Sequence, residues 1–212
     1  MLAARSGVRP PIVPRFRTSL GDTLGTVSSS AGPRQPSPDR ASGAGIGLRP
    51  ATLDDAEAIR TIYNHEVENT TATFDLVPRS LEDQREWLAA RSGAFAAVVA
   101  VDSASGEVVG FSALSPYKER AAYRTSVEDS VYVDRSLARR GIGRVIVNHL
   151  LDVARDSGFH AVFARIEASG TASRALHEAC GFRLVGVEVE VGRKFNRWLD
   201  VALMQCLLHE RP

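Results

Sequence analysis

The chain has 212 residues, a formal net charge of +1 and a hydrophobic fraction of 44%, and 24% of its residues are charged. These values are typical of one ordinary globular domain with an appended segment. They give no support for a nucleic-acid partner, which calls for a strongly basic surface. No apolar run approaches the ~20 residues that a membrane-spanning helix needs, so no membrane association is expected.

Residues 1–45 differ in composition from the rest of the chain. They hold six of the ten prolines, six arginines, two aspartates and no lysine, which gives a net charge of +4. The remainder has 20 basic and 23 acidic side chains, and therefore a net charge of −3. Because the first segment cannot build a packed core, we predict a disordered extension over 1–45 and a folded domain over 46–208. A transit peptide, a low-complexity tail and a wrongly chosen start codon are alternative interpretations of the extension.

The two cysteines, Cys180 and Cys206, are lone thiols without metal-ligand spacing. Such sparse cysteine usage is typical of proteins in a reducing compartment. The sequence therefore predicts a cytoplasmic protein without a metal site.

From Ile46 onward, segments with strand periodicity alternate with segments of helical periodicity. Strands are expected over residues 46–49, 71–76, 95–102, 107–114, 126–133, 160–167, 182–189 and 199–207. Helices are expected from a capping box at Thr52 to about Asn69, after the N-cap Ser80, between Gly143 and Gly158, and over residues 172–180. Residues 103–106 join two of the strands as a hairpin. This order predicts an α/β (α+β) fold, in which a mixed sheet has helices on its faces.

The most informative motif is a strand that leads through a glycine-containing turn into an amphipathic helix. The strand ends at residues 131–133, and the turn is Arg-Arg-Gly-Ile-Gly-Arg over residues 139–144. The N-terminus of a helix presents unpaired N–H groups and the positive end of the dipole, and glycine lets an anion approach the backbone closely. The motif therefore predicts a pyrophosphate site, with an ordinary strand-to-helix turn as the alternative.

Glu128 is the candidate general base. Strand alternation places it on the face of Ser126, Ser130 and Tyr132, opposite Val127. A glutamate is disfavoured in the middle of a strand, so its presence calls for a reason. A carboxylate near an acyl site can take the proton that an attacking amine must lose. The alternative is a solvated residue on an exposed strand face.

Three stretches together resemble the GCN5-related N-acetyltransferase (GNAT) superfamily. They are the motif of residues 131–158, the strand over 162–167, and Ala-Ser-Arg-Ala-Leu-His-Glu-Ala-Cys-Gly-Phe over 172–182. The resemblance extends over about residues 46–208 and implies the GNAT fold, with a mostly antiparallel central sheet. Three further segments are similar to the phosphinothricin and methionine sulfoximine acetyltransferase branch, namely residues 62–71, 125–133 and 191–200.

The resemblance implies that acetyl-CoA is the co-substrate. The residues implied to bind it line the strand and the turn, with one more on the next helix: Val131, Tyr132, Val133, Arg139, Arg140, Gly141, Ile142, Gly143, Arg144 and Ser173. An extended amide-bearing arm can pair with a strand edge, and N–H groups there can polarise a thioester carbonyl. Two positions depart from the family pattern: Ala138 stands where Gln or Arg is usual, and Gly170 where Asn is usual. We expect both departures to affect the affinity for CoA.

The resemblance also implies roles in catalysis and substrate binding. Glu128 is implied to lie beside the substrate amine as its base. His177 is implied to assist departure of the thiolate, with Tyr132 as the alternative acid and a packing or capping histidine as the other interpretation. A loop of three charged residues is implied to contact the amino-acid substrate, since a cation suits its carboxylate: Lys118, Glu119 and Arg120. A homodimer is implied as well.

The predicted function is acetyl-CoA-dependent N-acetylation of the α-amino group of a small amino acid analogue, by direct attack in a ternary complex. Phosphinothricin, methionine sulfoximine and methionine sulfone are the expected substrates, and antibiotic or herbicide resistance is the expected consequence. The alternatives are a protein N-terminal or polyamine acetyltransferase and a non-catalytic acyl-CoA-binding module. Nucleic-acid binding through the arginines of the turn is disfavoured by the acidic character of residues 46–212.

Overall fold

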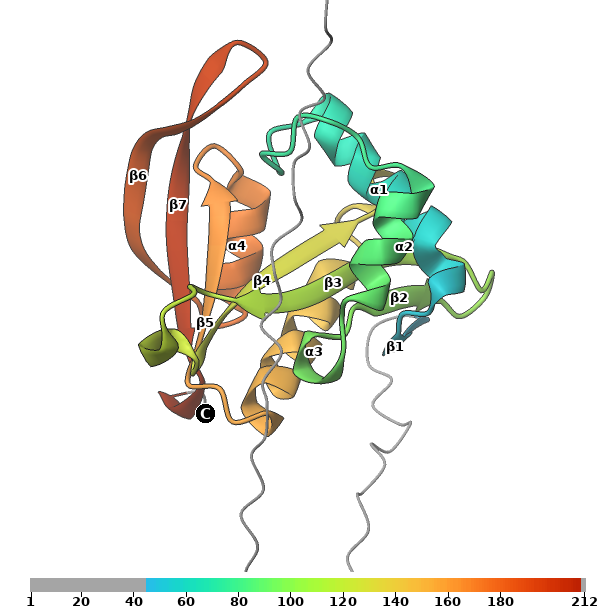
Figure 1. Ribbon diagram of the computed structural model, residues 1–212, viewed down its shortest axis with the longest axis horizontal. Helices are drawn as coiled ribbons and strands as arrows, with labels where there is room; N and C mark the ends of the chain where they lie inside the picture. The colour runs from blue at the N-terminus through green and yellow to red at the C-terminus, as the bar shows by residue number, and fades with distance from the viewer. Residues whose placement is uncertain (1–44, 211–212) are drawn as a thin grey trace, which may run out of the picture. The chain divides into compact units, whose positions relative to one another are not determined.

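The computed structural model describes residues 45–210, without the side chain of Glu210. The predicted extension over 1–45 lies outside the described residues, except for Gly45. Within residues 45–210, seven strands form one mixed sheet in the order β1-β2-β3-β4-β5-β7-β6 (Figure 1). They are β1 (Ile46–Pro50), β2 (Val98–Asp102), β3 (Val108–Pro116), β4 (Ser126–Val133), β5 (Ala161–Glu167), β6 (Arg183–Lys194) and β7 (Arg197–Leu207). Only the β4–β5 pair is parallel among these strands.

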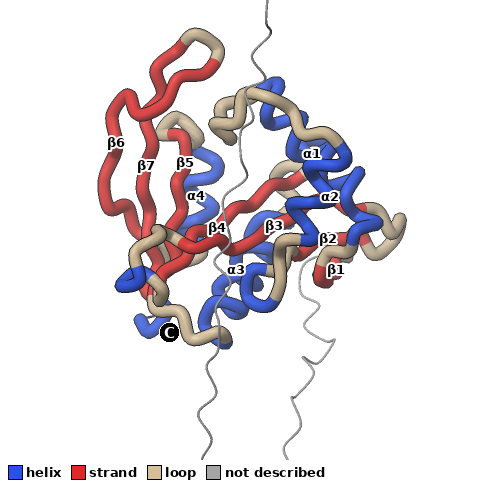
Figure 2. Tube along the Cα trace, viewed as in Figure 1, coloured by secondary structure: helices blue, strands red, loops and turns tan. Residues whose placement is uncertain are grey.

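Helices cover both faces of the sheet. Those within the described residues are α1 (Ala56–Asn69), α2 (Leu81–Ala89), α3 (Ile142–Asp156) and α4 (Thr171–Ala179), and Figure 2 shows them in blue beside the red strands. The core on one face contains Ile59 of α1 with Phe111 of β3. The core on the other face contains Leu150 of α3 with Val127 of β4 and Met204 of β7. None of the helices in residues 45–210 is long and apolar enough to span a bilayer.

Local signals in the sequence account for several helix boundaries. The Ser80 hydroxyl accepts the N–H of Asp83 at 3.1 Å, and the Asp83 carboxylate accepts the N–H of Ser80 at 3.0 Å, so a capping box begins α2. The predicted box at Thr52 also forms, but it precedes a short 3-10 turn, and α1 begins at Ala56. Gly158 adopts φ 76°, the left-handed conformation that ends α3. The predicted fold class is confirmed.

The strand predicted over residues 71–76 is wrong, because this segment is part of an irregular loop between α1 and α2. Its threonines satisfy polar groups through side chains instead of pairing with a neighbouring strand. The Thr71 hydroxyl donates to Glu167 Oε2 at 2.9 Å, and the Thr73 hydroxyl lies 3.0 Å from the Tyr63 hydroxyl. β-branched residues suit strands only where an edge is available, so the pattern was misleading here.

Two further boundaries differ from the prediction. The strand expected from residue 95 begins at Val98, because residues 93–95 form a 3-10 turn. The two last strands are longer than expected and form a hairpin that turns at Phe195 and Asn196, both with positive φ. The lengthened hairpin extends past the end of β5 and reaches the loop between α1 and α2 (Figure 1).

Candidate active site

The strands β4 and β5 diverge in the middle of the sheet. They pair only from Ser126–Glu128 to Ala161–Phe163, and Figure 1 shows the two strands separating beyond that point. On its other side, β4 stays paired with β3 as far as Val133. The β5-facing edge of residues 129–133 therefore lies outside the strand pairing recorded for residues 45–210. Such an edge can accept an extended amide-bearing molecule as an added strand.

The glycine-containing turn lies at the N-terminus of α3. Gly141 is the N-cap with φ 81°, and a Cβ built on it would meet nothing within 4 Å, so the space in front of the helix is open. Arg135 in the preceding turn forms a bidentate ion pair with Glu66 of α1, at 2.7 and 2.8 Å. This pair holds the turn against α1. Open space at Gly141, beside a helix N-terminus, is a geometry suited to an anion.

Two glycines set the spacing between α3, α4 and β5. A Cβ on Gly143 would lie 2.9 Å from Cδ2 of Leu176, so the helices approach closely there. A Cβ on Gly170 would lie 2.9 Å from the Glu167 carbonyl oxygen. The second contact gives a physical reason for the departure at position 170, because any longer side chain would have to move the backbone at the end of β5.

Glu128 lies at the last paired position of β4 with β5, opposite Phe163. Its side chain is partly buried, and burial raises the pKa of its carboxyl above the ordinary value. The Arg165 guanidinium opposes that rise, whereas the negative charges of Asp129 and Glu188 add to it. A carboxylate with a raised pKa is suited to exchanging a proton near neutral pH.

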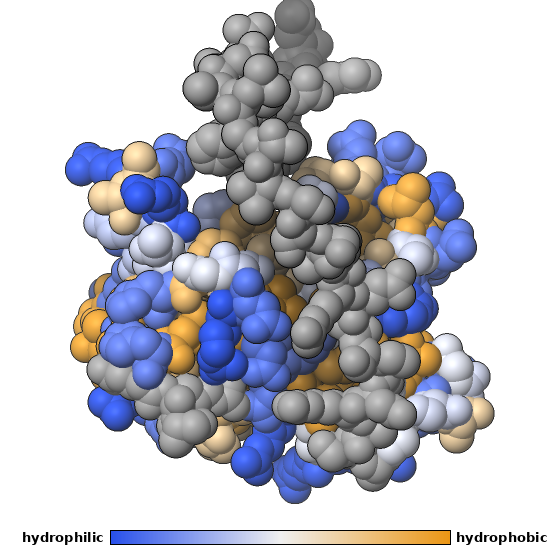
Figure 3. Space-filling view, turned by 90° about the horizontal axis from the view of Figure 1, so that it is seen from below, coloured by the Kyte–Doolittle hydropathy of each residue, from blue (hydrophilic) through white to orange (hydrophobic). Residues whose placement is uncertain are grey.

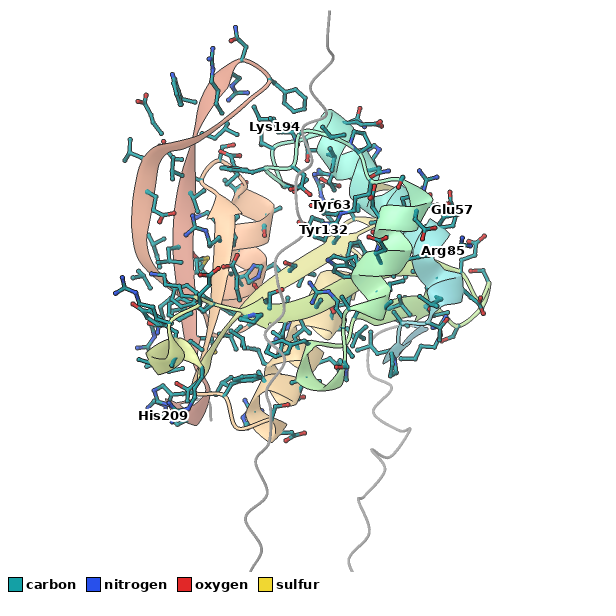
Figure 4. The ribbon with its side chains drawn as sticks, viewed as in Figure 1. Glu57, Tyr63, Arg85, Tyr132, Lys194 and His209 are labelled. Carbon is teal, nitrogen blue, oxygen red and sulfur yellow. The ribbon has the colours of Figure 1, made fainter. Side chains whose placement is uncertain are left out.

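Tyr132 lies on the same face of β4 as Glu128, as strand alternation predicts. Figure 4 shows it beside Tyr63 of α1, and their rings meet edge to face at 5.1 Å. It also stacks on Phe111 with ring centroids 5.1 Å apart. Removal of its hydroxyl from water raises the pKa of Tyr132 well above the usual value. The raised pKa makes this phenol a weaker proton donor.

His177 and Asp129 form a buried pair on the opposite face of the sheet. The side chains are 5% and 3% exposed, and His177 Nε2 lies 3.1 Å from Asp129 Oδ2. His177 Nδ1 lies 2.7 Å from the Ser173 carbonyl oxygen, which can only accept, so Nδ1 bears a proton. Although burial opposes protonation, the bond to Asp129 raises the pKa of His177 overall. Both ring nitrogens are thus engaged, and the role of His177 in protonating a thiolate stays a prediction.

The three charged loop residues predicted to contact substrate line one open pocket with Tyr123. The pocket is formed by Lys118, Glu119, Arg120 and Tyr123. Tyr117, next to the pocket, stacks on Phe163 with ring centroids 4.0 Å apart and an interplanar angle of 9°. Because Phe163 is the strand partner of Glu128, the stack joins the loop to the strand position of the candidate base.

The loop between α1 and α2, residues 70–80, bounds the site on another side. Lys194 of the β6–β7 hairpin is only 4% exposed and donates to the Thr73 carbonyl oxygen at 2.8 Å. Figure 4 shows Lys194 between the hairpin and α1. A Cβ on Gly192 would overlap the Phe74 ring, so only glycine lets this ring pack there. The hairpin and the loop are therefore fastened to each other.

Several residues of this region were not identified from the sequence. Asp129 faces away from Glu128 by alternation, and only the packing of α4 brings His177 to it. Arg165 and Lys194 lie on separate strands, and no local motif marks either of them. Strand alternation was the one available signal for Arg165, because it places this residue on the face of β5 opposite the buried Val162 and Ala164.

Comparison with known proteins agrees with this geometry. The sequence profile described as the acetyltransferase (GNAT) domain matches residues 48–203. A phosphinothricin N-acetyltransferase from Streptomyces coelicolor is 39% identical over 80% of this chain and 97% of its own length. An L-methionine sulfoximine/L-methionine sulfone acetyltransferase from Pseudomonas aeruginosa strain PAO1 is 35% identical over 76% of this chain and 94% of its own. A phosphinothricin acetyltransferase from Sinorhizobium meliloti, solved with acetyl-CoA, has a TM-score of 0.73 and 35% identity, covering 77% and 88% of the two chains.

The candidate site thus combines a diverging strand pair, a helix N-terminus and a carboxylate at the point where the strands separate. The chain belongs to the GNAT acetyltransferase family. The predicted superfamily, fold and class of activity, an acetyl-CoA-dependent N-acetyltransferase, are confirmed.

Proposed function

We propose that the chain transfers the acetyl group of acetyl-CoA to the α-amino group of a small amino acid or analogue, of the phosphinothricin or methionine sulfoximine type. The proposal depends most on Glu128, a partly buried carboxylate at the point where β4 and β5 separate. The catalytic domain is proposed to span residues 46–208. The names of the relatives support the substrate class, and the acetyl-CoA complex of the Sinorhizobium enzyme supports the co-substrate.

A free strand edge and an open helix N-terminus support the residues proposed to hold acetyl-CoA. The free edge of Val131, Tyr132 and Val133 would pair with the amide-bearing arm, and the backbone of residues 139–144 would bind the pyrophosphate. The open space at Gly141 and the arginines of the turn favour a multiply charged anion. Ser173 lies in the first turn of α4. Bound acetyl-CoA supplies an acetyl group activated as a thioester.

Glu128 and the β4 backbone are proposed to act on the two reacting groups. Glu128 accepts the proton that the acceptor's ammonium group must lose before its nitrogen can attack. N–H groups along residues 131–133 stabilise the negative charge that develops on the acyl oxygen. Each turnover forms one nitrogen–carbon bond and breaks one carbon–sulfur bond, and of the two protons that the ammonium group loses, one ends on the CoA thiol and the other in solvent. The engaged ring of His177 suits a positioning role, in which it holds β4 against α4.

Lys118, Glu119 and Arg120 are proposed to bind the amino-acid acceptor. They line one pocket with Tyr123, and a cation there suits the α-carboxylate. A substrate whose ammonium group reaches Glu128 would extend toward this loop, because Tyr117 of the loop stacks on the strand partner of Glu128.

Thiol release from acetyl-CoA with a panel of acceptors tests the proposed function. Phosphinothricin, methionine sulfoximine and methionine sulfone are expected to support turnover, with a polyamine and a short peptide giving little. Preference for the polyamine or the peptide would instead identify the alternative acetyltransferases. Tight binding of acetyl-CoA without turnover of any amine would indicate a binding module.

Gly141→Ala is expected to raise KM for acetyl-CoA by roughly 10-fold, because a methyl group would enter the space proposed for the pyrophosphate. Gly158→Ala is the matched control. Gly158 lies at the opposite end of α3 and has φ 76°, and its Cβ would also meet nothing within 4 Å. Steady-state kinetics of the two variants separate backbone strain from loss of the anion site. Equal KM values for acetyl-CoA in the two variants would contradict the assignment of the turn at Gly141 as the pyrophosphate site.

We also propose a cytoplasmic homodimer whose interface includes β6. This strand is at one edge of the sheet, and five of its apolar side chains are 48–72% exposed: Leu184, Val185, Val187, Val189 and Val191. Figure 3 shows hydrophobic surface at the left edge, the side on which Figure 1 draws β6. A long apolar edge favours pairing with a second chain. A cytoplasmic location would give access to acetyl-CoA, and acetylation of an amino-acid antibiotic there would provide resistance.

Val189→Lys is expected to yield monomers in light scattering coupled to size exclusion, while the wild type elutes as a dimer. Val189 is 72% exposed, so the change leaves the core of the subunit intact. A monomeric wild type, or a variant that remains dimeric, would contradict the assigned interface.

A further inference from the structure

Arg165 projects from the same face of the sheet as Glu128. Glu128 and Phe163 are register partners, and Arg165 is the next β5 residue on the face of Phe163. The β5 residues of the other face are buried in the core beneath α3 and α4: Val162, Ala164 and Ile166. Arg165 therefore lies just beyond the point where β4 and β5 separate, about 6–7 Å along β5 from the level of Glu128.

Arg165 lies between two positions of β5 that are contacted by residues of two loops. At one end, Tyr117 covers Phe163 by stacking on it. At the other end, Thr71 of the α1–α2 loop donates to Glu167, two residues beyond Arg165. Between these covered positions, the Arg165 side chain remains 34% exposed. A molecule held at Glu128 and between the two loops would therefore meet this guanidinium.

Glu188 of β6 holds the guanidinium in place. Its two carboxylate oxygens accept from Nη2 and Nη1 of Arg165 at 2.5 and 3.3 Å. Ion pairs as exposed as this one contribute little to stability, so stability alone is a weak reason for the pair. A guanidinium has five N–H donors, and two bonds to Glu188 leave donors for an anion. Glu188 thus orients a fork-shaped donor on the open face.

We propose that Arg165 is a specificity-determining residue, which binds the oxyanion at the far end of the acceptor's side chain. This inference rests on the proposed function. With the α-ammonium group at Glu128 and the α-carboxylate at the loop of Lys118, the acceptor's side chain can extend along β5 toward Arg165. The planar fork matches a phosphinate or carboxylate, and binds the oxygens of a neutral sulfone less strongly. The site would therefore favour acceptors with a second anionic group.

Arg165→Met tests the assignment through the ratio of kcat/KM for two acceptors. Phosphinothricin has a phosphinate at the end of its side chain, whereas methionine has the same α-amino acid group and a neutral side chain. The variant is expected to lose roughly 10- to 100-fold in kcat/KM for phosphinothricin, the effect of losing a charged hydrogen bond, and under 3-fold for methionine. Arg165→Lys keeps the charge without the fork and is expected to retain part of the preference.

Arg155→Met is the matched control, because Arg155 is similarly exposed and pairs with Asp152 on α3 at 2.8 Å. It is expected to change neither value. An equal loss of kcat/KM for both acceptors in Arg165→Met, or no loss for either, would overturn the proposal that Arg165 binds the side-chain oxyanion. Either result would leave the proposed function standing. Turnover of methionine without turnover of phosphinothricin by the wild type would also overturn it. Turnover of no amino acid by the wild type would refute the proposed function, and this inference with it.

Discussion

The Glu128→Gln variant is expected to have a turnover number about 10²–10⁴-fold below that of the wild type, with little change in KM for acetyl-CoA. Glutamine keeps the shape of the side chain but cannot accept the ammonium proton. Because Glu128 lies at the last paired position of β4 with β5, its loss should not disturb the strand edge proposed for acetyl-CoA. Steady-state thiol release with saturating acetyl-CoA measures the effect.

The pH profile separates a base from a binding residue. Burial raises the pKa of Glu128, and activity needs its deprotonated form. The kcat/KM of the wild type should therefore increase with pH through a value above the ordinary glutamate pKa of 4.5. Glu128→Gln should lose this acid limb. Glu57→Gln on α1, an exposed ion-pair residue, is the matched control and should keep it. Turnover of Glu128→Gln within 2-fold of the wild type would remove Glu128 from the mechanism.

His177→Ala is expected to lower the free energy of unfolding by about 3–5 kcal/mol, because it leaves the Asp129 carboxylate buried without its partner. Asp129→Asn should cost less, about 1–2 kcal/mol, since an amide can still donate to the ring. His65→Ala, an exposed histidine on α1, is the control and should change stability little. Urea unfolding at pH 6 measures all three variants. A cost below 1 kcal/mol for His177→Ala would contradict the buried pair.

The same pair predicts how stability varies with pH. The pKa of His177 is raised in the folded protein, so the folded state binds this proton more tightly than the unfolded state. The contribution of this proton to the free energy of unfolding is fully present below the unfolded pKa of about 6.5. It is lost as the pH rises through the folded pKa. Asp129→Asn should weaken this dependence. If the stabilities of the wild type and of Asp129→Asn change in parallel between pH 6 and 9, the pair is not the source of this pH dependence.

The periodicity of the sequence was sufficient for most elements of the fold. Strand β4 was predicted with the boundaries that the structure shows, because its alternation is uninterrupted and a glycine-containing turn follows it. The segment of residues 71–76 was misassigned, since its two threonines favour a strand locally but bind Glu167 and Tyr63 in the folded chain. No periodicity in that segment can report on partners as distant as Glu167.

The residues of the candidate site likewise fall into two groups, those that local sequence predicts and those that only the fold brings together. Alternation along β4 was enough to place Glu128 and Tyr132 on one face, and the glycine positions were enough to predict the turn that leads into α3, where we propose an anion site. The pairing of His177 with Asp129, 48 residues away, needed the packing of α4 against the sheet. Arg165 and Glu188 are 23 residues apart and meet only because β7 lies between β5 and β6.

The sequence by itself was enough for the resemblance to the GNAT superfamily, which implied acetyl-CoA as the co-substrate, and its short-range features predicted an anion site and a candidate base. Strand and helix periodicity, a glycine-containing turn and a glutamate in the middle of a strand can each be recognised within about ten residues. The tertiary structure decided which side chains surround that base. The divergence of β4 from β5, the fastening of Lys194 to the α1–α2 loop and the guanidinium of Arg165 on the open face arise from strand order and long-range contacts. These contacts could not be predicted from the sequence, since hydrogen bonds and ion pairs act only between groups that the fold brings together.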